Sequence, residues 1–345
     1  MGPGRVQALT GRTQNSLHRA ATGATIPRMR PAILAALLTL ASVLPASAVS
    51  LHQGDMVAID THWGPFYTRV VRLVPGSGLV EQIAIRGLLE NASATDLAVL
   101  SDGRILVSTW MRGVVVVQPN DGAQSVYLTE AALGGKVSGL AVESGGTVLM
   151  LVHSAGEGRI LRHDPADGSL EIVSSGSDLS DCGDIAISRH GGELFVSRAQ
   201  SPTSGAAFGS IVRLSPQGAP LAVFTSDEFR GPSQLAVTGN GQVYASNGGS
   251  MAAGYSGRLT RTEIATGITV SAAPGNECSG VAVIAPEQVF YSWKSTSQVG
   301  ETWSVACLSP AGWSVSDVTG PIEVVTEEPV PARSASWGAV KRTYR

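Results

Sequence analysis

The feature that most constrains the fold is a sequence pattern that returns six times along the chain. Each copy has a short apolar segment, a tight turn and a second short apolar segment, as in residues 96–108 (DLAVLSDGRILVS). These segments are rich in β-branched residues and too short for typical helices, so they predict β-strands. The turns are 43 to 49 residues apart, at positions 54, 103, 146, 192, 241 and 287.

A second pattern recurs in step with the first and adds a hairpin to each copy. It ends a β-rich segment in a turn such as Pro75 to Gly78 or Pro165 to Gly168. Proline fixes φ and glycine permits positive φ, so both residues favour tight turns. Each copy therefore predicts four strands, A to D, and four-stranded units repeated about every 40–50 residues are typical of β-propellers. We predict an all-β fold, a six-bladed β-propeller of four-stranded blades.

The two ends of the repeated region predict how the ring closes. The first copy begins near Gly54 and lacks an inner strand A. Residues 320–325 (GPIEVV) follow the sixth copy and match residues 231–236 (GPSQLA), which we assign to the inner strand of the fifth copy. We therefore expect this C-terminal strand to complete blade 1, which leaves no long sheet edge open.

The order of inner strand, Asp-Gly turn, second strand and Arg-x-x-Pro-x-x-Gly resembles a broad group of six-bladed propellers over about residues 50–330. This group includes NHL-repeat proteins, the SMP-30/gluconolactonase family and strictosidine-synthase-like proteins. The resemblance implies the architecture. Members of the group hydrolyse lactones with a divalent metal, act as lyases or condensing enzymes, or bind ligands and proteins, and a fold does not select among such functions.

Residues 1–48 predict a basic n-region and a signal peptide that is removed on export. An uncharged run extends from Pro31 to Ala48 and ends in the small-x-small pattern of Ala46 to Ala48. Its apolar centre, Ile33 to Leu44, is about as long as a signal-peptide core and too short for a membrane span. We therefore expect a secreted or periplasmic protein, not an integral membrane protein, whose mature part is a monomeric propeller of residues 49–345.

The charge balance argues against a nucleic-acid partner. The net charge of the chain is −3, but residues 1–48 hold five arginines and no acidic residue. Without them the chain keeps 19 basic and 27 acidic side chains, a net charge of −8. A surface that binds nucleic acid needs the opposite sign.

Binding residues are expected on the face that carries the B–C and D–A loops. The A–B and C–D turns on the other face are short and alike, whereas the B–C and D–A loops are expected to be long and to differ from copy to copy. Variable loops on a rigid scaffold commonly carry binding sites, and aromatic rings there can stack on a ligand. The predicted ligand-binding residues are His62, Trp63, Trp110, Arg112, His153, Arg198, Trp293 and Lys294.

The inner strands also predict a ring of polar side chains at the mouth of the central channel on that face. Three carboxylates and the amide of Gln234 suit a hard cation such as Ca²⁺. The resemblance to SMP-30-like enzymes, which hold their metal with Glu, Asn and Asp, adds an asparagine. The sequence leaves open the alternative that the carboxylates cap turns and that no cofactor is bound. The predicted metal ligands are Asp96, Asp184, Asn247 and Glu323.

Two functions follow from these observations. The first is an exported propeller that binds a small molecule or a protein on the B–C and D–A loop face. The alternative is a metal-dependent, lactonase-like hydrolase or a lyase that acts on a small cyclic or sugar-derived substrate. The sequence lacks the motifs of serine hydrolases, zincins, P-loop NTPases and dinucleotide-binding enzymes, so it assigns no catalytic residue.

Overall fold

The computed structural model describes most of the chain that follows the predicted export segment. The chain divides into two compact units, Met1–Pro45 and Ala46–Arg345, and the described residues all belong to the second. The prediction for residues 1–48 lies outside them. No helix in the described part is long and apolar enough to cross a membrane. The described residues are 49–60, 68–199, 209–248, 257–274, 277–284, 288–297, 300–307, 314–316 and 320–325.

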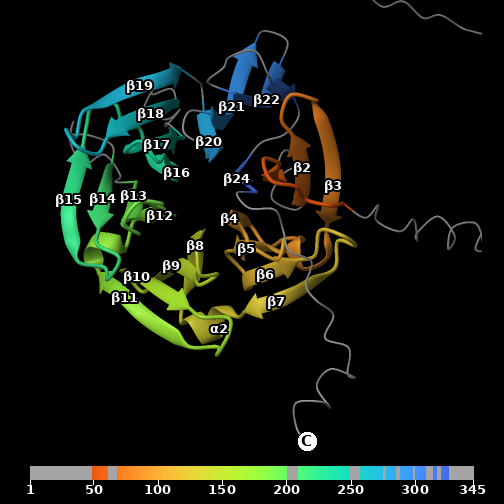
Figure 1. Cartoon of the computed structure of the whole chain (residues 1–345), viewed down its shortest axis with the longest axis horizontal. Helices are drawn as coiled ribbons and strands as arrows, with labels where there is room; N and C mark the ends of the chain where they lie inside the picture. Colours follow the sequence, from red (N-terminus) through yellow and green to blue (C-terminus); the bar gives the residue numbers. More distant parts are fainter. Residues whose placement is uncertain are drawn as a thin grey trace, which may run out of the picture. The chain divides into compact units, whose positions relative to one another are not determined.

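The strands form six four-stranded antiparallel sheets, one for each copy of the repeat (Figure 1). We number the sheets 1 to 6 in chain order and name their strands A to D from the inside outward. The A strands are β24 (Ile322–Val324), β4 (Ala94–Val99), β8 (Lys136–Val142), β12 (Cys182–Ile187), β16 (Pro232–Val237) and β20 (Glu277–Ile284). The B strands are β1 (Met56–Asp60), β5 (Ile105–Thr109), β9 (Val148–Ser154), β13 (Leu194–Arg198), β17 (Gln242–Asn247) and β21 (Gln288–Ser297).

The C and D strands complete each sheet on its outer side. Short helical segments, η1 (Gly87–Leu89), α2 (Glu130–Leu133) and η2 (Ser177–Leu179), join sheets 1 to 4 in sequence. The C strands are β2 (Arg69–Val74), β6 (Gly113–Val117), β10 (Glu157–His163), β14 (Ser210–Leu214), β18 (Arg258–Glu263) and β22 (Gly300–Cys307). The D strands are β3 (Leu79–Ile85), β7 (Gln124–Leu128), β11 (Leu170–Gly176), β15 (Pro220–Thr225), β19 (Thr269–Pro274) and β23 (Ser314–Ser316).

The inner strands surround a common centre. Contacts run from β24 to β4, β8, β12, β16 and β20 in turn, and from β20 back to β24. The strand β24 completes sheet 1 by pairing with β1, with Met56 opposite Val324 and Ala58 opposite Ile322. The predicted all-β propeller with four-stranded blades is confirmed.

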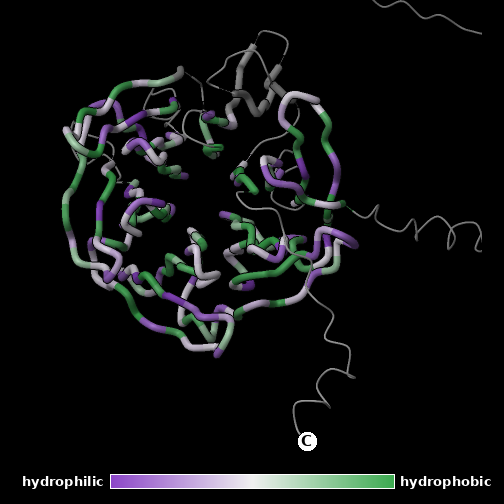
Figure 2. The backbone as a smooth tube through the Cα atoms, in the orientation of Figure 1, coloured by the Kyte–Doolittle hydropathy of each residue, from purple (hydrophilic) through white to green (hydrophobic). Residues whose placement is uncertain are grey.

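The hydrophobic core lies between neighbouring sheets. One cluster joins Leu106 and Val116 of sheet 2 to Val137 and Met150 of sheet 3, and all of these residues are buried. Complete burial of one such side chain stabilises the fold by roughly 1.5–3 kcal/mol. Hydrophobic residues occur in the inner and the outer strands alike (Figure 2). The sheets therefore stabilise one another by packing face to face.

Hydroxyl groups add hydrogen bonds from one sheet to the inner strand of the next. The Oγ1 of Thr95 donates to the carbonyl of Val137 at 3.0 Å, and the Oγ of Ser197 donates to the carbonyl of Ser233 at 2.7 Å. The Oγ of Ser292 similarly donates to the carbonyl of Gly320 at 2.8 Å. Bonds of this kind fix the register between neighbouring sheets, which hydrophobic packing alone does not.

The predicted A–B turns are present. In sheet 2, Gly103 has φ +84° and its N–H donates to the carbonyl of Leu100 at 2.9 Å. In sheet 5, Gly241 also has φ +84° and donates to the carbonyl of Thr238. Glycine adopts positive φ without the steric cost that other residues incur. The turn positions in the sequence repeat therefore follow from backbone geometry.

We expect the strand β24 to be essential for stability. Deletion of residues 319–345 removes it, exposes the edge of β1 and should lower the melting temperature by more than about 10 °C, because a shift of this size corresponds to a loss of several kcal/mol. Deletion of residues 326–345, which retains β24, is the matched control and should melt close to the full chain. Differential scanning calorimetry measures both. Equal melting temperatures for the two truncations would contradict the role assigned to β24.

Candidate functional site

Polar side chains from four inner strands meet at the centre of the sheets. Asp96, Asp184, Gln234 and Glu323 come from sheets 2, 4, 5 and 1, and all four line one cavity of about 680 Å³. The cavity also contacts A–B turn residues such as Ser101. The sequence placed these side chains at the mouth on the B–C face, and this was wrong. Asp96, Asp184 and Gln234 are each the third residue of a strand, so they lie inside the channel.

The carboxyl group of Asp96 connects three sheets. One oxygen, Oδ2, accepts a hydrogen bond from the N–H of Leu140 in the neighbouring sheet at 2.7 Å. The other, Oδ1, accepts from the Nε2 of Gln234 at 3.2 Å. Asp96 is buried, so each of these bonds replaces a contact with water. This side chain therefore contributes to the structure of the ring.

Asp184 and Gln234 form the same kind of link farther round the ring. The carboxylate of Asp184 accepts from the N–H groups of Ile185 and Leu235, both at 2.7 Å. The Oε1 of Gln234 accepts from the N–H of Val281 at 2.9 Å and from that of Ile322 at 3.2 Å. Asp96, Asp184 and Gln234 thus each bond the backbone of the next sheet, and Gln234 also reaches β24.

Glycine at two of the six equivalent inner-strand positions, in sheets 3 and 6, makes this arrangement possible. A Cβ atom at Gly139 would lie 2.8 Å from the Cα of Asp184, and one at Gly280 would lie 3.0 Å from the Oε1 of Gln234. Both distances are shorter than normal van der Waals contact. Glycine at these two positions therefore provides the space that the polar side chains occupy.

Protonation of the central carboxyl groups is shifted by burial and by their mutual charge. Burial raises the pKa of Asp96 to about 6. Burial, together with the negative charge of Asp96, raises the pKa of Asp184 well above its ordinary value. The same two causes raise the pKa of Glu323 to about 8, although its side chain is only partly buried. Neighbouring buried carboxyl groups favour a state in which they hold a proton, because ionisation of both would bring two like charges together.

The predicted metal ligands are not brought together as a set. Asn247 is buried at the end of β17, where its Oδ1 accepts from the N–H of Arg230 and its Nδ2 donates to Ala245 and Thr260. Among the described residues, no three His, Cys, Asp or Glu side chains are grouped as metal ligands. All four carboxylate oxygens of Asp96 and Asp184 already accept a hydrogen bond from the protein. Binding of Ca²⁺ stays a prediction.

A second hollow lies on the B–C and D–A loop face, between sheets 2 and 3. We call it the blade 2–3 notch, and its volume is about 910 Å³. The B–C connections here are short: residues 110–112 join β5 to β6, and residues 155–156 join β9 to β10. The sequence analysis expected long B–C loops throughout, but only some of the sheets have them. The notch is lined by Met111, Arg112, Thr129, Glu130, Ala131, Gly134, Gly135, Lys136, His153, Ser154, Ala155, Gly156, Glu157 and Ser180.

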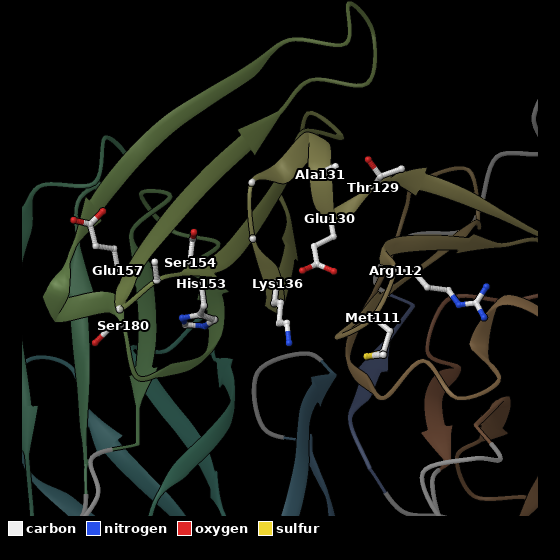
Figure 3. Close-up of a pocket in the computed structure, with 14 residues that line it drawn as sticks. Met111, Arg112, Thr129, Glu130, Ala131, Lys136, His153, Ser154, Glu157 and Ser180 are labelled. Carbon is white, nitrogen blue, oxygen red and sulfur yellow. The ribbon is translucent and has the colours of Figure 1, made fainter.

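Three of the predicted ligand-binding residues meet at this notch. Arg112 and His153 line it, and the ring of Trp110 lies 4.9 Å from the Nζ of the lining residue Lys136. Figure 3 shows the side chains of Glu130 and Lys136 projecting into the notch, with Arg112 at its rim. The site therefore combines charged, aromatic and apolar groups.

His153 is held in a fixed position by a serine of the inner strand. The Oγ of Ser138 lies 2.7 Å from the Nε2 of His153 and 3.3 Å from the carbonyl of Cys182. Burial lowers the pKa of His153, so the imidazole is neutral at neutral pH. In sheets 2, 5 and 6 the serine or threonine at the position of Ser138 instead bonds a serine of strand B, as Thr95 bonds Ser108 at 2.8 Å. The hydrogen bond between Ser138 and His153 therefore takes the place of a structural contact that sheets 2, 5 and 6 make between strands A and B.

The remaining predicted ligand-binding residues lie elsewhere or outside the described part. Arg198 ends β13, and its Nη1 lies 3.9 Å from the carboxylate of Asp178. His62 and Trp63 fall outside the described residues. Trp293 and Lys294 belong to β21, but their side chains are not among those described.

The sequence analysis missed Lys136 and Glu130 as residues of the notch. Lys136 begins β8 directly after Gly134 and Gly135, and Glu130 begins α2 after Thr129, whose hydroxyl caps the helix by accepting from the N–H of Ala132. Both residues belong to a D–A loop, whereas the prediction concentrated on B–C loops. The sequence signal that could have identified Lys136 is a charged residue directly after two glycines at the start of a strand.

Comparison with known proteins supports the fold. No protein-family model matches the chain, and no curated protein matches it. Among solved structures, a nidogen/laminin complex aligns with TM-score 0.60 and 12% identity over 80% of this chain and 99% of that one. TolB from Acinetobacter baumannii aligns with a TM-score of 0.55 and 12% identity over 76% of this chain and 65% of TolB. A Bacteroides caccae protein of unknown function aligns with a TM-score of 0.54 and 12% identity over 80% of this chain and 100% of that protein. At such identities the similarity concerns the fold alone.

The central carboxyl groups predict that stability falls as the pH rises from 5 to 9. Their pKa values are higher in the folded than in the unfolded chain, so the stabilisation is complete below the unfolded values and is lost as the pH passes about 6 and about 8. The loss in unfolding free energy should be on the order of a few kcal/mol. Thermal unfolding monitored by circular dichroism across this range measures it.

Glu323→Gln tests the contribution of one carboxyl group. The variant cannot ionise at this position, so it should melt several degrees above the wild type at pH 9 and close to it at pH 5. Glu171→Gln, on the outer strand β11 away from the central cluster, is the control and should leave the slope of melting temperature against pH unchanged. A wild-type melting temperature that rises between pH 6 and 9 would show that these groups are not protonated in the folded protein.

Proposed function

We propose that this protein is an exported β-propeller that binds a small molecule or a protein partner on its B–C and D–A loop face. The observation that carries the proposal is the blade 2–3 notch, which places Trp110, Arg112 and His153 around one hollow. Trp110 and Arg112 come from sheet 2 and His153 from sheet 3, and the sequence predicts all three as ligand-binding residues. Their convergence supports a binding role for this face.

The proposal includes a ring of six blades closed by β24. It is supported by the six sheets, by the pairing of β24 with β1, and by the contacts of β24 with both β20 and β4. A closed ring has no long open sheet edge, which favours a monomer. Export rests on the sequence pattern of residues 1–48.

Photo-crosslinking tests the binding face. A photoreactive amino acid is placed at Met111, which is 61% exposed at the notch, or at Val223, which is 59% exposed on the outer strand β15. After irradiation in an extract of the source cells, adducts should form at Met111 at several times the yield at Val223. The adduct mass distinguishes a small molecule from a protein. Equal yields at both positions would contradict a binding site at the notch.

The metal-dependent hydrolase or lyase is the second candidate, and the cluster of Asp96, Asp184 and Glu323 in one cavity favours it. If Ca²⁺ binds there, it should neutralise the like charges and raise the melting temperature of the chelator-treated protein, because a ligand that binds only the native state stabilises it. Asp184→Asn should weaken this response. A melting temperature unchanged by millimolar Ca²⁺, Mg²⁺ and Mn²⁺ would remove the metal site and this candidate.

A further inference from the structure

Four charged side chains line the blade 2–3 notch, and none of them forms an ion pair with another described residue: the basic Arg112 and Lys136 and the acidic Glu130 and Glu157. Lys136 and Glu130 project into the notch (Figure 3), and neither forms an ion pair with another described residue. Two opposite charges in one hollow therefore remain available for a ligand. Arginines that do form ion pairs are Arg69, Arg72, Arg104, Arg162, Arg198, Arg213 and Arg258.

The ammonium group of Lys136 is held in place without being neutralised. Its Nζ lies 4.9 Å from the centroid of the Trp110 ring, and the aromatic face attracts the cation by its quadrupole. An aromatic face accepts no conventional hydrogen bond, so the N–H donors stay available to an acceptor in the notch. A carboxylate is the acceptor that matches both this charge and these donors.

The turn that carries Trp110 is fixed by hydrogen bonds. The N–H of Trp110 donates to the carbonyl of Ser93 at 3.1 Å, and the N–H of Arg112 donates to the Oγ1 of Thr109 at 3.1 Å. Thr109 in turn donates to the carbonyl of Gly113. The turn is therefore ordered before a ligand binds, which reduces the entropy lost on binding.

The residues exposed on this turn are of the types found at protein interfaces. Trp110 is 38% exposed and Met111 is 61% exposed, and Arg112 follows them at the rim. Trp, Met and Arg are enriched in protein–protein interfaces, and Trp and Arg often dominate the binding energy. Small-molecule sites, by contrast, enclose most of the ligand surface. A notch bordered by exposed loops fits a polypeptide better.

We propose that the notch binds a polypeptide segment of a partner protein that carries an acidic side chain for Lys136, a basic side chain for Glu130, and an apolar side chain that packs on Trp110 and Met111. This inference rests on the proposed binding face and specifies its ligand. A purely acidic segment is disfavoured by Glu130, and a purely basic one by Lys136, because like charges at an interface oppose association.

Selection of phage-displayed random 12-residue peptides on the immobilised protein tests the inference. Enriched peptides should contain an acidic residue and a basic residue beside an apolar one, and synthetic copies should bind in fluorescence polarisation more weakly at 300 mM than at 50 mM NaCl. Lys136→Glu and Glu130→Lys should each weaken binding at least about tenfold. Lys136→Arg, which keeps the charge, should retain most of it.

The control variant is Arg261→Glu, which makes the same charge change on β18 of sheet 5, away from the notch, and should leave the affinity unchanged. The melting temperature of each variant is measured as well. A value within a few degrees of wild type excludes unfolding as the cause of weaker binding. A copy of each peptide with its acidic residue replaced by Lys should bind Lys136→Glu better than wild type.

Two results would overturn the inference: no peptide enriched on wild type over Lys136→Glu, or enriched peptides whose affinity is independent of Lys136 and Glu130. These results can be distinguished from failure of the proposed function. A small-molecule adduct at Met111 with no selected peptide leaves the binding face intact and removes only the polypeptide ligand. Equal crosslinking at Met111 and Val223 removes the binding face itself.

Discussion

The hydrogen bonds among the inner strands are the interactions on which the rest of the structure depends. Asp96, Asp184 and Gln234 each bond the backbone of the next inner strand, and Gln234 also bonds β24, the strand that completes sheet 1. Buried polar groups are costly unless they are paired, so each of these bonds selects one relative position of two sheets. The hydrophobic clusters between the sheets then pack in that arrangement.

The same central groups make the molecule sensitive to protonation. Three carboxyl groups in one cavity repel one another when they are ionised, and burial increases the cost of their charges. Protonation of Asp96 and Asp184 relieves this repulsion, so the stability of the ring depends on pH. Among the described residues, no three His, Cys, Asp or Glu side chains are grouped to hold a metal. The hydrogen bonds between neighbouring sheets give the central carboxyl groups a structural role instead.

The blade 2–3 notch on the loop face has a different design, because its half-buried Lys136 and Glu130 form no ion pair with another described residue. The short connections at residues 110–112 and 155–156 leave a hollow between sheets 2 and 3, and the D–A loop adds α2 to its wall. Lys136 is oriented by Trp110, and His153 is fixed by Ser138. A rigid scaffold thus presents groups that need a partner, which is the arrangement expected of a binding surface.

The sequence by itself determined the strands, the turns and the pairing of the C-terminal strand with the first sheet, because Gly103 and Gly241 mark turns that only certain backbone angles permit. It also selected Trp110, Arg112 and His153 as ligand-binding residues, and their binding role stays a prediction. Only the tertiary structure decided that Asp96 and Asp184 lie inside the channel and that Asn247 is engaged within its own sheet. It also decided that Lys136 faces the notch. The physical reason is that a repeat specifies local backbone geometry, whereas the position of a side chain relative to another sheet depends on contacts between residues far apart in the chain, such as Asp96 and Gln234.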